Sequence, residues 1–257
     1  MNNFYNIFNV KNKIVLITGS SRGIGFTLAE GFAKAGSIVI INSKNEKNLR
    51  KTENYFITTG YKVYAYCFDV NNIKQVEESI NDIENNVGPI DVLINNAGIH
   101  KRSFLELMTA EQWNDVINTN LTSVFYTSKI VAQFMIKRKK GKIINITSLN
   151  AEGARPGIAN YCAAKGGLKM LTKAMAVEWG KYNILVNAIG PGYFLTDLTY
   201  ELAQNQDFNN WVIENIPLKR WGKPEDLIGI AIFLASDASN YINGQTIYVD
   251  GGWLAGL

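Results

Sequence analysis

The segment Ile14-Val15-Leu16-Ile17-Thr18-Gly19-Ser20-Ser21-Arg22-Gly23-Ile24-Gly25 decides the fold of this chain. Its first four residues are apolar and mostly β-branched, which predicts a short strand that is buried on both faces. The glycines that follow predict a tight turn into a helix, whose N–H groups and positive dipole suit a pyrophosphate. Their spacing is G-x-x-x-G-x-G, which differs from the commoner G-x-G-x-x-G dinucleotide fingerprint. We expect the nucleotide to contact Gly19, Ser21, Arg22, Gly23, Ile24 and Gly25.

Six more short apolar runs follow, and the segments between them are long enough to form helices. This alternation predicts right-handed βαβ units. We therefore predict a single-domain α/β Rossmann fold over residues 1–257, a doubly wound seven-stranded parallel sheet with helices on both faces. Ligands bind beyond the carboxyl ends of the strands in such a sheet. The predicted strands are Ile14–Ile17, Ile38–Ile41, Val63–Tyr66, Val92–Ile94, Ile143–Ile146, Ile184–Ala188 and Thr246–Val249.

The stretch 194–217 departs from this alternation. It lies between a predicted strand end and the next helix, and it contains Phe208 and Trp211 without a strand pattern. Its place beside the expected ligand site predicts a mobile lid over the cleft, and an ordinary surface insertion is the alternative.

Composition argues against several classes of function. A net charge of +4 over 257 residues is small, and the basic run Lys137–Lys140 has no interleaved aromatic residues, so we expect no nucleic-acid binding. We interpret that run as the solvated last turn of a helix that Gly141 stops. The sequence has no run of eighteen apolar residues, so we expect no transmembrane helix. We also expect no secretory signal. Cys67 and Cys162 are too few for a disulfide framework and suit a reducing cytoplasm, and we predict no metal site.

The end of the second predicted strand bears on the choice of nucleotide. A carboxylate there accepts from the ribose 2′-hydroxyl of NAD and repels the 2′-phosphate of NADP. This chain has Ser43 and Lys44 instead, and Arg22 lies in the glycine turn. Because cations beside a hydroxyl suit a phosphate, we predict NADP rather than NAD. Asp69, after the third strand, is expected to accept from the adenine amine, and the alternative is a helix N-cap.

Tyr161 and Lys165 are four residues apart, so on a helix they share one face. A phenol is a poor base at neutral pH, and a neighbouring ammonium lowers its pKa. Ser148 lies upstream of this pair. Together with the nucleotide site, these residues predict proton transfer coupled to a nicotinamide cofactor, and hence an oxidoreductase.

In combination, these features resemble the short-chain dehydrogenase/reductase family over nearly the whole chain. The resemblance implies that Tyr161 donates a proton to a carbonyl oxygen while the nicotinamide delivers hydride. It implies that Lys165 binds the nicotinamide ribose and that Ser148 hydrogen-bonds the reacting oxygen. Asn120 is expected to hold a water that links Lys165 to solvent. The motifs are T-G-x-x-x-G-x-G at 18–25, Asp69-Val70, N-N-A-G at 95–98, Asn120, Ser148, Y-x-x-x-K at 161–165 and Pro191-Gly192.

The resemblance also extends the cofactor contacts and implies an assembly. Members of the family are commonly homotetramers built on the helices that contain Asn120 and Tyr161 and on the C-terminal strand. The apolar ending Trp253–Leu257 is consistent with burial against a neighbour. The added cofactor contacts are Val70, Asn96, Ala97, Gly98, Pro191 and Gly192.

Within the family, segments such as Glu152–Ile158 and Arg220–Gly222 are similar to the gluconate 5-dehydrogenases, which interconvert gluconate and 5-keto-gluconate. A keto-sugar acid needs a cation for its carboxylate and polar groups for its hydroxyls. Lys101 and Glu152 are expected at the cleft mouth with these groups. We interpret His100 as a residue of the cleft rim, or as a residue that supports those in contact with substrate. A catalytic role is not expected for it, because Tyr161 already supplies the proton. The expected substrate contacts are Arg102, Asn150, Arg155 and Tyr193.

Three alternatives stay open. The 2-deoxy-gluconate 3-dehydrogenases share the C-terminal segment Val249–Ala255, so another keto-uronate is a candidate substrate. The 3-oxoacyl-acyl-carrier-protein reductases share fold and tetrad, but they carry arginines for the acidic carrier where this chain has Gln133 and Val177. A cofactor-sensing regulatory module without catalysis would predict a damaged tetrad, whereas the motif residues here are complete.

Overall fold

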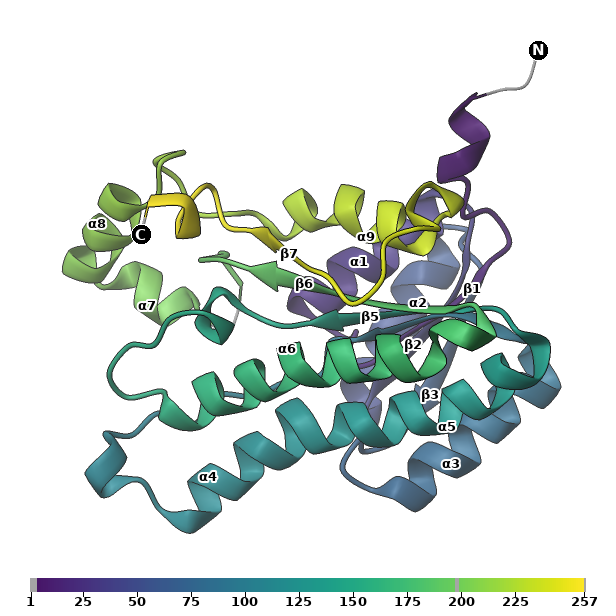
Figure 1. The fold of residues 1–257 in the computed structure, drawn as a ribbon, viewed down its shortest axis with the longest axis horizontal. Helices are drawn as coiled ribbons and strands as arrows, with labels where there is room; N and C mark the ends of the chain where they lie inside the picture. The colour runs from purple at the N-terminus through teal and green to yellow at the C-terminus, as the bar shows by residue number, and fades with distance from the viewer. Residues whose placement is uncertain (1–3, 197–198, 257) are drawn as a thin grey trace.

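A computed structural model describes residues 4–196 and 199–256 of the chain. Within this part, parallel strands form one sheet in the order β3-β2-β1-β4-β5-β6-β7 (Figure 1). All seven predicted strands are confirmed; β1 and β7 have the predicted bounds, and the others are one to three residues longer. The order reverses between β1 and β4, so a cleft opens there at the carboxyl ends. The strands are β1 (Ile14–Ile17), β2 (Ile38–Ser43), β3 (Val63–Cys67), β4 (Ile90–Asn95), β5 (Gly141–Ile146), β6 (Ile184–Pro191) and β7 (Thr246–Val249).

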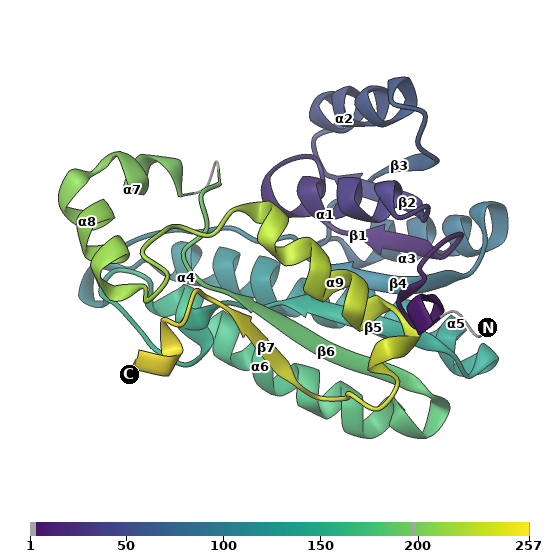
Figure 2. The same ribbon diagram turned by 90° about the horizontal axis from the view of Figure 1, so that it is seen from above.

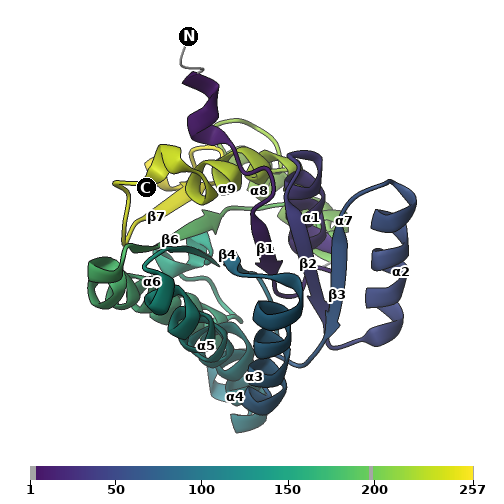
Figure 3. The same cartoon turned by 90° about the vertical axis from the view of Figure 1, so that its right-hand side faces the viewer.

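Helices cover both faces of the sheet, because strand side chains point alternately to either face and both sets are apolar. One core packs under α1, α2 and α9, and a second packs under α3, α5 and α6 (Figure 3). None of the helices that the structure describes is both long and apolar enough to span a bilayer. The helices are α1 (Gly23–Lys34), α2 (Glu46–Thr58), α3 (Ile73–Asp82), α4 (Ala110–Ile117), α5 (Ser123–Arg138), α6 (Ala159–Trp179), α7 (Tyr200–Gln204), α8 (Gln206–Asn215) and α9 (Ile228–Ala235).

The predicted lid region contains α7 and α8, which project beyond the end of the sheet next to the C-terminal segment (Figure 2). Asp197 and Leu198 of this region lie outside the described residues. The region packs through aromatic rings that surround Tyr193 at centroid distances of 4.9–5.9 Å. The predicted motion of this region stays a prediction. The rings around Tyr193 are Phe208, Trp211, Trp221 and Trp253.

The basic run after α5 differs from its predicted role in two ways. Lys139 itself takes the left-handed conformation that ends the helix, with φ 50° and ψ 43°. Arg138 is only partly exposed: its guanidinium bonds the Glu84 carboxylate at 2.9 and 3.1 Å and the carbonyl of Ile90. Gly141 therefore does not stop the helix. It begins β5, where a Cβ would lie 2.1 Å from Met135 Sδ.

Gly141→Ala is therefore expected to destabilise the fold by about 1–3 kcal/mol, because the added methyl overpacks the core against Met135. Urea unfolding followed by circular dichroism measures the effect. Gly229→Ala is the matched control, because Gly229 lies on α9 with nothing within 4 Å of the added Cβ. That control should be neutral or stabilising by up to about 1 kcal/mol. Equal effects in the two variants would show that close packing at Gly141 does not matter.

Candidate active site

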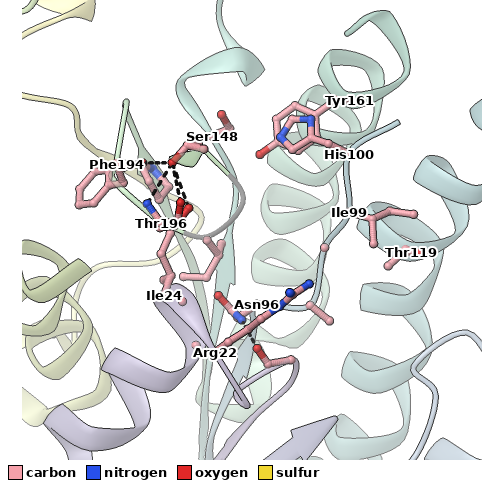
Figure 4. Close-up of a pocket in the computed structure, with 18 of the residues that line it drawn as sticks. Arg22, Ile24, Asn96, Ile99, His100, Thr119, Ser148, Tyr161, Phe194 and Thr196 are labelled. Carbon is pink, nitrogen blue, oxygen red and sulfur yellow. Dashed lines mark hydrogen bonds between the residues drawn. The ribbon is translucent and has the colours of Figure 1, made fainter. Parts of the chain in front are cut away.

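A cavity of about 540 Å³ opens beyond the carboxyl ends of the strands on both sides of the β1/β4 reversal (Figure 4). A cavity of this size can hold part of a dinucleotide together with a small substrate. Every residue predicted to contact cofactor or substrate lines it, and so do Ser148, Tyr161 and Lys165. Asn120 is the predicted site residue that does not. The predicted lining residues are Gly19, Ser21, Arg22, Gly23, Ile24, Gly25, Ser43, Lys44, Asp69, Val70, Asn96, Ala97, Gly98, Arg102, Asn150, Arg155, Pro191, Gly192 and Tyr193.

The glycine turn packs so closely that two of its glycines admit no side chain. Gly19 has φ +62°, and a Cβ on it would lie 2.8 Å from the Cα of Ala97. A Cβ on Gly25 would lie 2.4 Å from Nδ2 of Asn96. That amide in turn donates to the carbonyls of Thr18 and Gly19, each at 3.0 Å. The bare turn thus leaves a backbone cradle of the kind that a pyrophosphate requires.

Asn42 is a site residue that the sequence reasoning missed. The N–H of Gly19 donates to Asn42 Oδ1 at 3.1 Å, and Asn42 Nδ2 donates to the carbonyls of Tyr66 and Phe68 at 3.2 and 3.0 Å. The side chain therefore ties the glycine turn to β2 and β3. The available signal was a buried amide at the end of an otherwise apolar run, since such a group must find partners.

The predicted phosphate-binding residues lie at one end of the cleft. Lys44 is exposed, with Nζ 3.9 Å from a carboxylate oxygen of Asp69. Arg22 precedes α1, and it has no carboxylate partner among the described ion pairs. The alternative for Asp69 is wrong, because the N-cap of α3 is Asn72. Asp69 instead accepts from the backbone N–H of Asn71 at 2.9 Å.

Tyr161 and Lys165 share one face of α6, as predicted, and Lys165 Nζ lies 5.6 Å from the centre of the phenol ring. Lys165 donates to the carbonyl of Ile146 at 2.7 Å. The prediction for the phenol is wrong in direction: burial raises the pKa of Tyr161 to about 12, while the Ser148 hydroxyl and Arg155 oppose that rise. Burial also lowers the pKa of Lys165 to about 8. The phenol of Tyr161 is therefore protonated at neutral pH and can act as a proton donor.

Asn120 lies in a π-helical turn, Asn118–Thr122, that joins α4 to α5. Its amide is fully buried and bonds both backbone groups of Ile99, accepting at 2.8 Å and donating at 2.9 Å. The residue therefore holds the loop after β4 in place. Its predicted role toward a water stays a prediction.

His100 does not lie at the rim. Its imidazole stacks on the Tyr161 ring with centroids 3.7 Å apart and planes inclined by 24° (Figure 4). Nδ1 is buried and has no hydrogen-bond partner among the described residues. Burial, followed by the charges of Arg102, Lys165 and Arg155, lowers the pKa of His100 to about 3. The ring is thus neutral, and His100 is one of the residues that line the cavity.

The substrate end of the cleft holds two guanidiniums. Burial, followed by the charge of Arg155, lowers the pKa of Arg102. Arg155 lies over the Phe208 ring at 5.1 Å, and its buried Nε has no partner among the described residues. The charge of Glu201 opposes the lowering of the Arg102 pKa only as a minor influence, and no described carboxylate forms an ion pair with either guanidinium. Such a pair of cations suits an anionic ligand.

Lys101 and Glu152 do not join this group, contrary to expectation. Lys101 bonds Asp115 on α4. Glu152 accepts from Lys169, and from the Tyr248 hydroxyl at 2.5 Å. Opposite charges outside the cleft thus satisfy both side chains, and neither lines the cavity.

The buried ammonium of Lys165 makes stability depend on pH. Below pH 8 the folded protein carries a buried charge, whereas between about 8 and 10.5 only the unfolded chain binds this proton, so stability rises with pH there. Relative to Lys165→Met, wild-type unfolding free energy should increase by about 2 kcal/mol from pH 7 to 9.5. Lys173→Met, at an exposed position on the same helix, is the control. Equal pH profiles for wild type and Lys165→Met in urea titrations would contradict the burial effect.

No cluster of metal-ligating side chains occurs in residues 4–196 and 199–256.

A family model described as enoyl-(acyl carrier protein) reductase matches residues 19–254. The chain is 44% identical to gluconate 5-dehydrogenase of Gluconobacter oxydans, over 96% of each chain. It is 45% identical to 2-dehydro-3-deoxy-D-gluconate 5-dehydrogenase of Formosa agariphila, over 97% of this chain and 95% of that one. The structure of a gluconate 5-dehydrogenase from Burkholderia cenocepacia in complex with NADP and tartrate superposes with a TM-score of 0.96, at 43% identity over 99% and 100% of the chains.

Proposed function

The chain belongs to the short-chain dehydrogenase/reductase family, and from that premise we propose that it interconverts gluconate and 5-keto-gluconate with NADP. The observation that carries this proposal is the pair Arg102 and Arg155 at one end of a cleft that has a buried phenol, Tyr161, beside it. The guanidiniums suit the carboxylate of a sugar acid, and the phenol suits its carbonyl. Both curated relatives reported above act on six-carbon sugar acids, as their names state.

Bound NADPH would supply a hydride to the carbonyl carbon at C5. Tyr161 gives its proton to the carbonyl oxygen, which becomes the C5 hydroxyl, and solvent then restores the phenol proton. Ser148 donates a hydrogen bond to the same oxygen while negative charge develops on it. Asn150 and Tyr193 line the same cleft as this centre and the guanidiniums, and we assign to them contacts with the hydroxyls of the sugar chain.

The phosphate end of the cleft supports NADP. The bare glycine turn fits the pyrophosphate, and Arg22 with Ser43 and Lys44 holds the 2′-phosphate. Lys165 contacts the nicotinamide ribose, and Asp69 accepts from the adenine amine. The remaining predicted lining residues, Val70, Asn96, Ala97, Gly98, Pro191 and Gly192, contact the body of the cofactor.

Two other activities are the competing candidates. Gln133 on α5 and Val177 on α6 are exposed and uncharged, which argues against docking of an acidic acyl carrier protein. A 3-deoxy or 2-deoxy sugar acid remains the nearer competitor, because the same carboxylate and carbonyl contacts serve it. A regulatory module without catalysis is disfavoured, since Ser148, Tyr161 and Lys165 line one cavity.

We also propose a cytoplasmic homotetramer. Apolar side chains on α5 and α6 are exposed in the single chain: Phe125 at 43%, Met170 at 62% and Val177 at 82%. Exposed apolar residues on two adjacent helices suit burial against a second copy. Both cysteines are free, which fits a reducing compartment. Light scattering at micromolar concentration tests the assembly, and a monomer would refute it.

Steady-state NADPH oxidation tests the activity. We expect kcat/KM for 5-keto-gluconate to exceed that for a short 3-oxoacyl thioester by at least about 100-fold, because only the sugar acid offers a carboxylate to Arg102 and Arg155. A 2-keto-3-deoxy acid is the third substrate, and faster turnover of it would move the assignment to the deoxy acids. Activity confined to the thioester would overturn the proposal.

A further inference from the structure

We propose that His100 selects for a hydroxylated substrate, by forming a hydrogen bond through Nδ1 with a hydroxyl next to the carbonyl that reacts. The inference rests on the function proposed above. It assigns to the chain's single histidine a specificity role that is separate from the proton transfer by Tyr161 and from the binding of the carboxylate.

The first support is an unsatisfied atom beside the reacting centre. Nδ1 of His100 is buried and lacks a partner among the described residues, although buried polar atoms almost always have one. The imidazole lies 3.7 Å from the Tyr161 ring, centre to centre, and lines the same cavity (Figure 4). A substrate whose carbonyl oxygen contacts the Tyr161 hydroxyl therefore places its neighbouring carbons within reach of the imidazole.

The second support is that the backbone on both sides of His100 is held. On one side, Asn120 bonds both backbone groups of Ile99 at 2.8 and 2.9 Å. On the other, Asn160 Nδ2 donates to the carbonyl of Lys101 at 3.0 Å, and Asn160 Oδ1 accepts from the N–H of Tyr161 at 2.8 Å. Asn160 thus ties the His100 loop to the helix that carries Tyr161. Such preorganisation is what a directional contact needs.

The third support is the charge state of the ring. Burial first, and then the charges of Arg102, Lys165 and Arg155, oppose protonation of His100, so the imidazole stays neutral at physiological pH. A neutral ring offers little to a carboxylate, which the two guanidiniums bind instead. It suits a hydroxyl, which both donates and accepts and therefore pairs with either tautomer. In 5-keto-gluconate the carbons that flank the C5 carbonyl carry hydroxyls.

The test compares 5-keto-gluconate with 5-oxohexanoate, which has the same carboxylate and C5 carbonyl but no hydroxyl. His100→Phe keeps an aromatic ring against Tyr161 and removes both ring nitrogens, whereas His100→Asn keeps a polar atom near the Nδ1 position. In His100→Phe the ratio of kcat/KM for 5-keto-gluconate over 5-oxohexanoate should fall about tenfold. His100→Asn should retain most of the wild-type ratio. Thermal unfolding and NADPH binding check that both variants fold.

Each result bears on a distinct claim. An unchanged ratio in His100→Phe, even with slower turnover of both substrates, would overturn the hydroxyl contact and leave only a packing role against Tyr161. Equal loss of the ratio in both variants would also contradict it. A wild-type enzyme that reduces the thioester and neither keto acid would overturn the proposed function itself.

A second readout needs no variant. The chain has one histidine, so the imidazole ¹⁵N resonances of labelled protein are unambiguous. In the presence of NADPH, gluconate should shift the Nδ1 resonance of His100, because these two reduced partners bind without reacting. The analogue 5-hydroxyhexanoate, which lacks the flanking hydroxyls, should not. The same shift with both ligands would refute the contact.

Discussion

Replacing Tyr161 with Phe is expected to lower kcat for reduction of 5-keto-gluconate by roughly 10²- to 10⁴-fold, the usual contribution of a positioned general acid. The substitution removes one oxygen from a ring that is packed between α6 and the imidazole of His100. The ring keeps its contacts, so the fold and the affinity for NADPH should change little. Burial raises the pKa of Tyr161 to about 12, so the wild-type phenol carries its proton across the whole physiological range. The variant consequently loses a proton donor that is protonated at every physiological pH.

Tyr241→Phe is the matched control, because the same oxygen is removed from a fully exposed ring. It should leave kcat and KM within about twofold of wild type. Stopped-flow measurement of NADPH oxidation separates the chemical step from release of product. Turnover of Tyr161→Phe at the wild-type rate would mean that another group supplies the proton, and the assignment of the site would then fail.

Replacing both Arg22 and Lys44 with Ala should lower the preference for NADPH over NADH, measured as a ratio of kcat/KM, by about 100-fold. A hydrogen bond to a charged group contributes about 1.5–3 kcal/mol, and exposure of Lys44 places its share at the lower end. NADH has an uncharged 2′-hydroxyl where NADPH has a phosphate, so it forms no ionic contact with Arg22 or Lys44. The kcat/KM of the enzyme for NADH should therefore change little. The effect should also decrease at high salt, since the contact is electrostatic and near the surface.

Lys47→Ala provides the control, because Lys47 is exposed on α2 and does not line the cleft. That variant should keep the wild-type preference at every salt concentration. If the double variant also kept it, the 2′-phosphate would be held by other groups, and Asn45 and Asn48, which line the same end, would be the next candidates.

Local and periodic features of the chain could be predicted from the sequence. The seven strands follow from short apolar runs, because a strand buried on both faces must be apolar at every position. The glycine turn follows from its spacing after β1, and the shared face of Tyr161 and Lys165 follows from helical geometry. These properties depend on neighbours in the chain.

Partner choice between distant segments could not be predicted. Lys101 and Glu152 were expected at the cleft mouth, but Asp115 on α4 and Lys169 on α6 bind them elsewhere. Asn42 follows the predicted strand Ile38–Ile41, and only the fold places the N–H of Gly19 against its side chain. Salt bridges and amide contacts of this kind depend on distances that folding sets.

The doubly wound sheet, the position of the cofactor turn and the pairing of Tyr161 with Lys165 could be predicted without coordinates, because they follow from periodicity and spacing along the chain. The ionisation of that pair and the place of His100 depend on how distant segments pack. Burial raises the pKa of Tyr161, where a neighbouring ammonium was expected to lower it. His100 meets Tyr161 because Asn120 and Asn160 hold its loop against α6. Desolvation and contact are properties of the packed interior, and neither is encoded in any short stretch of the chain.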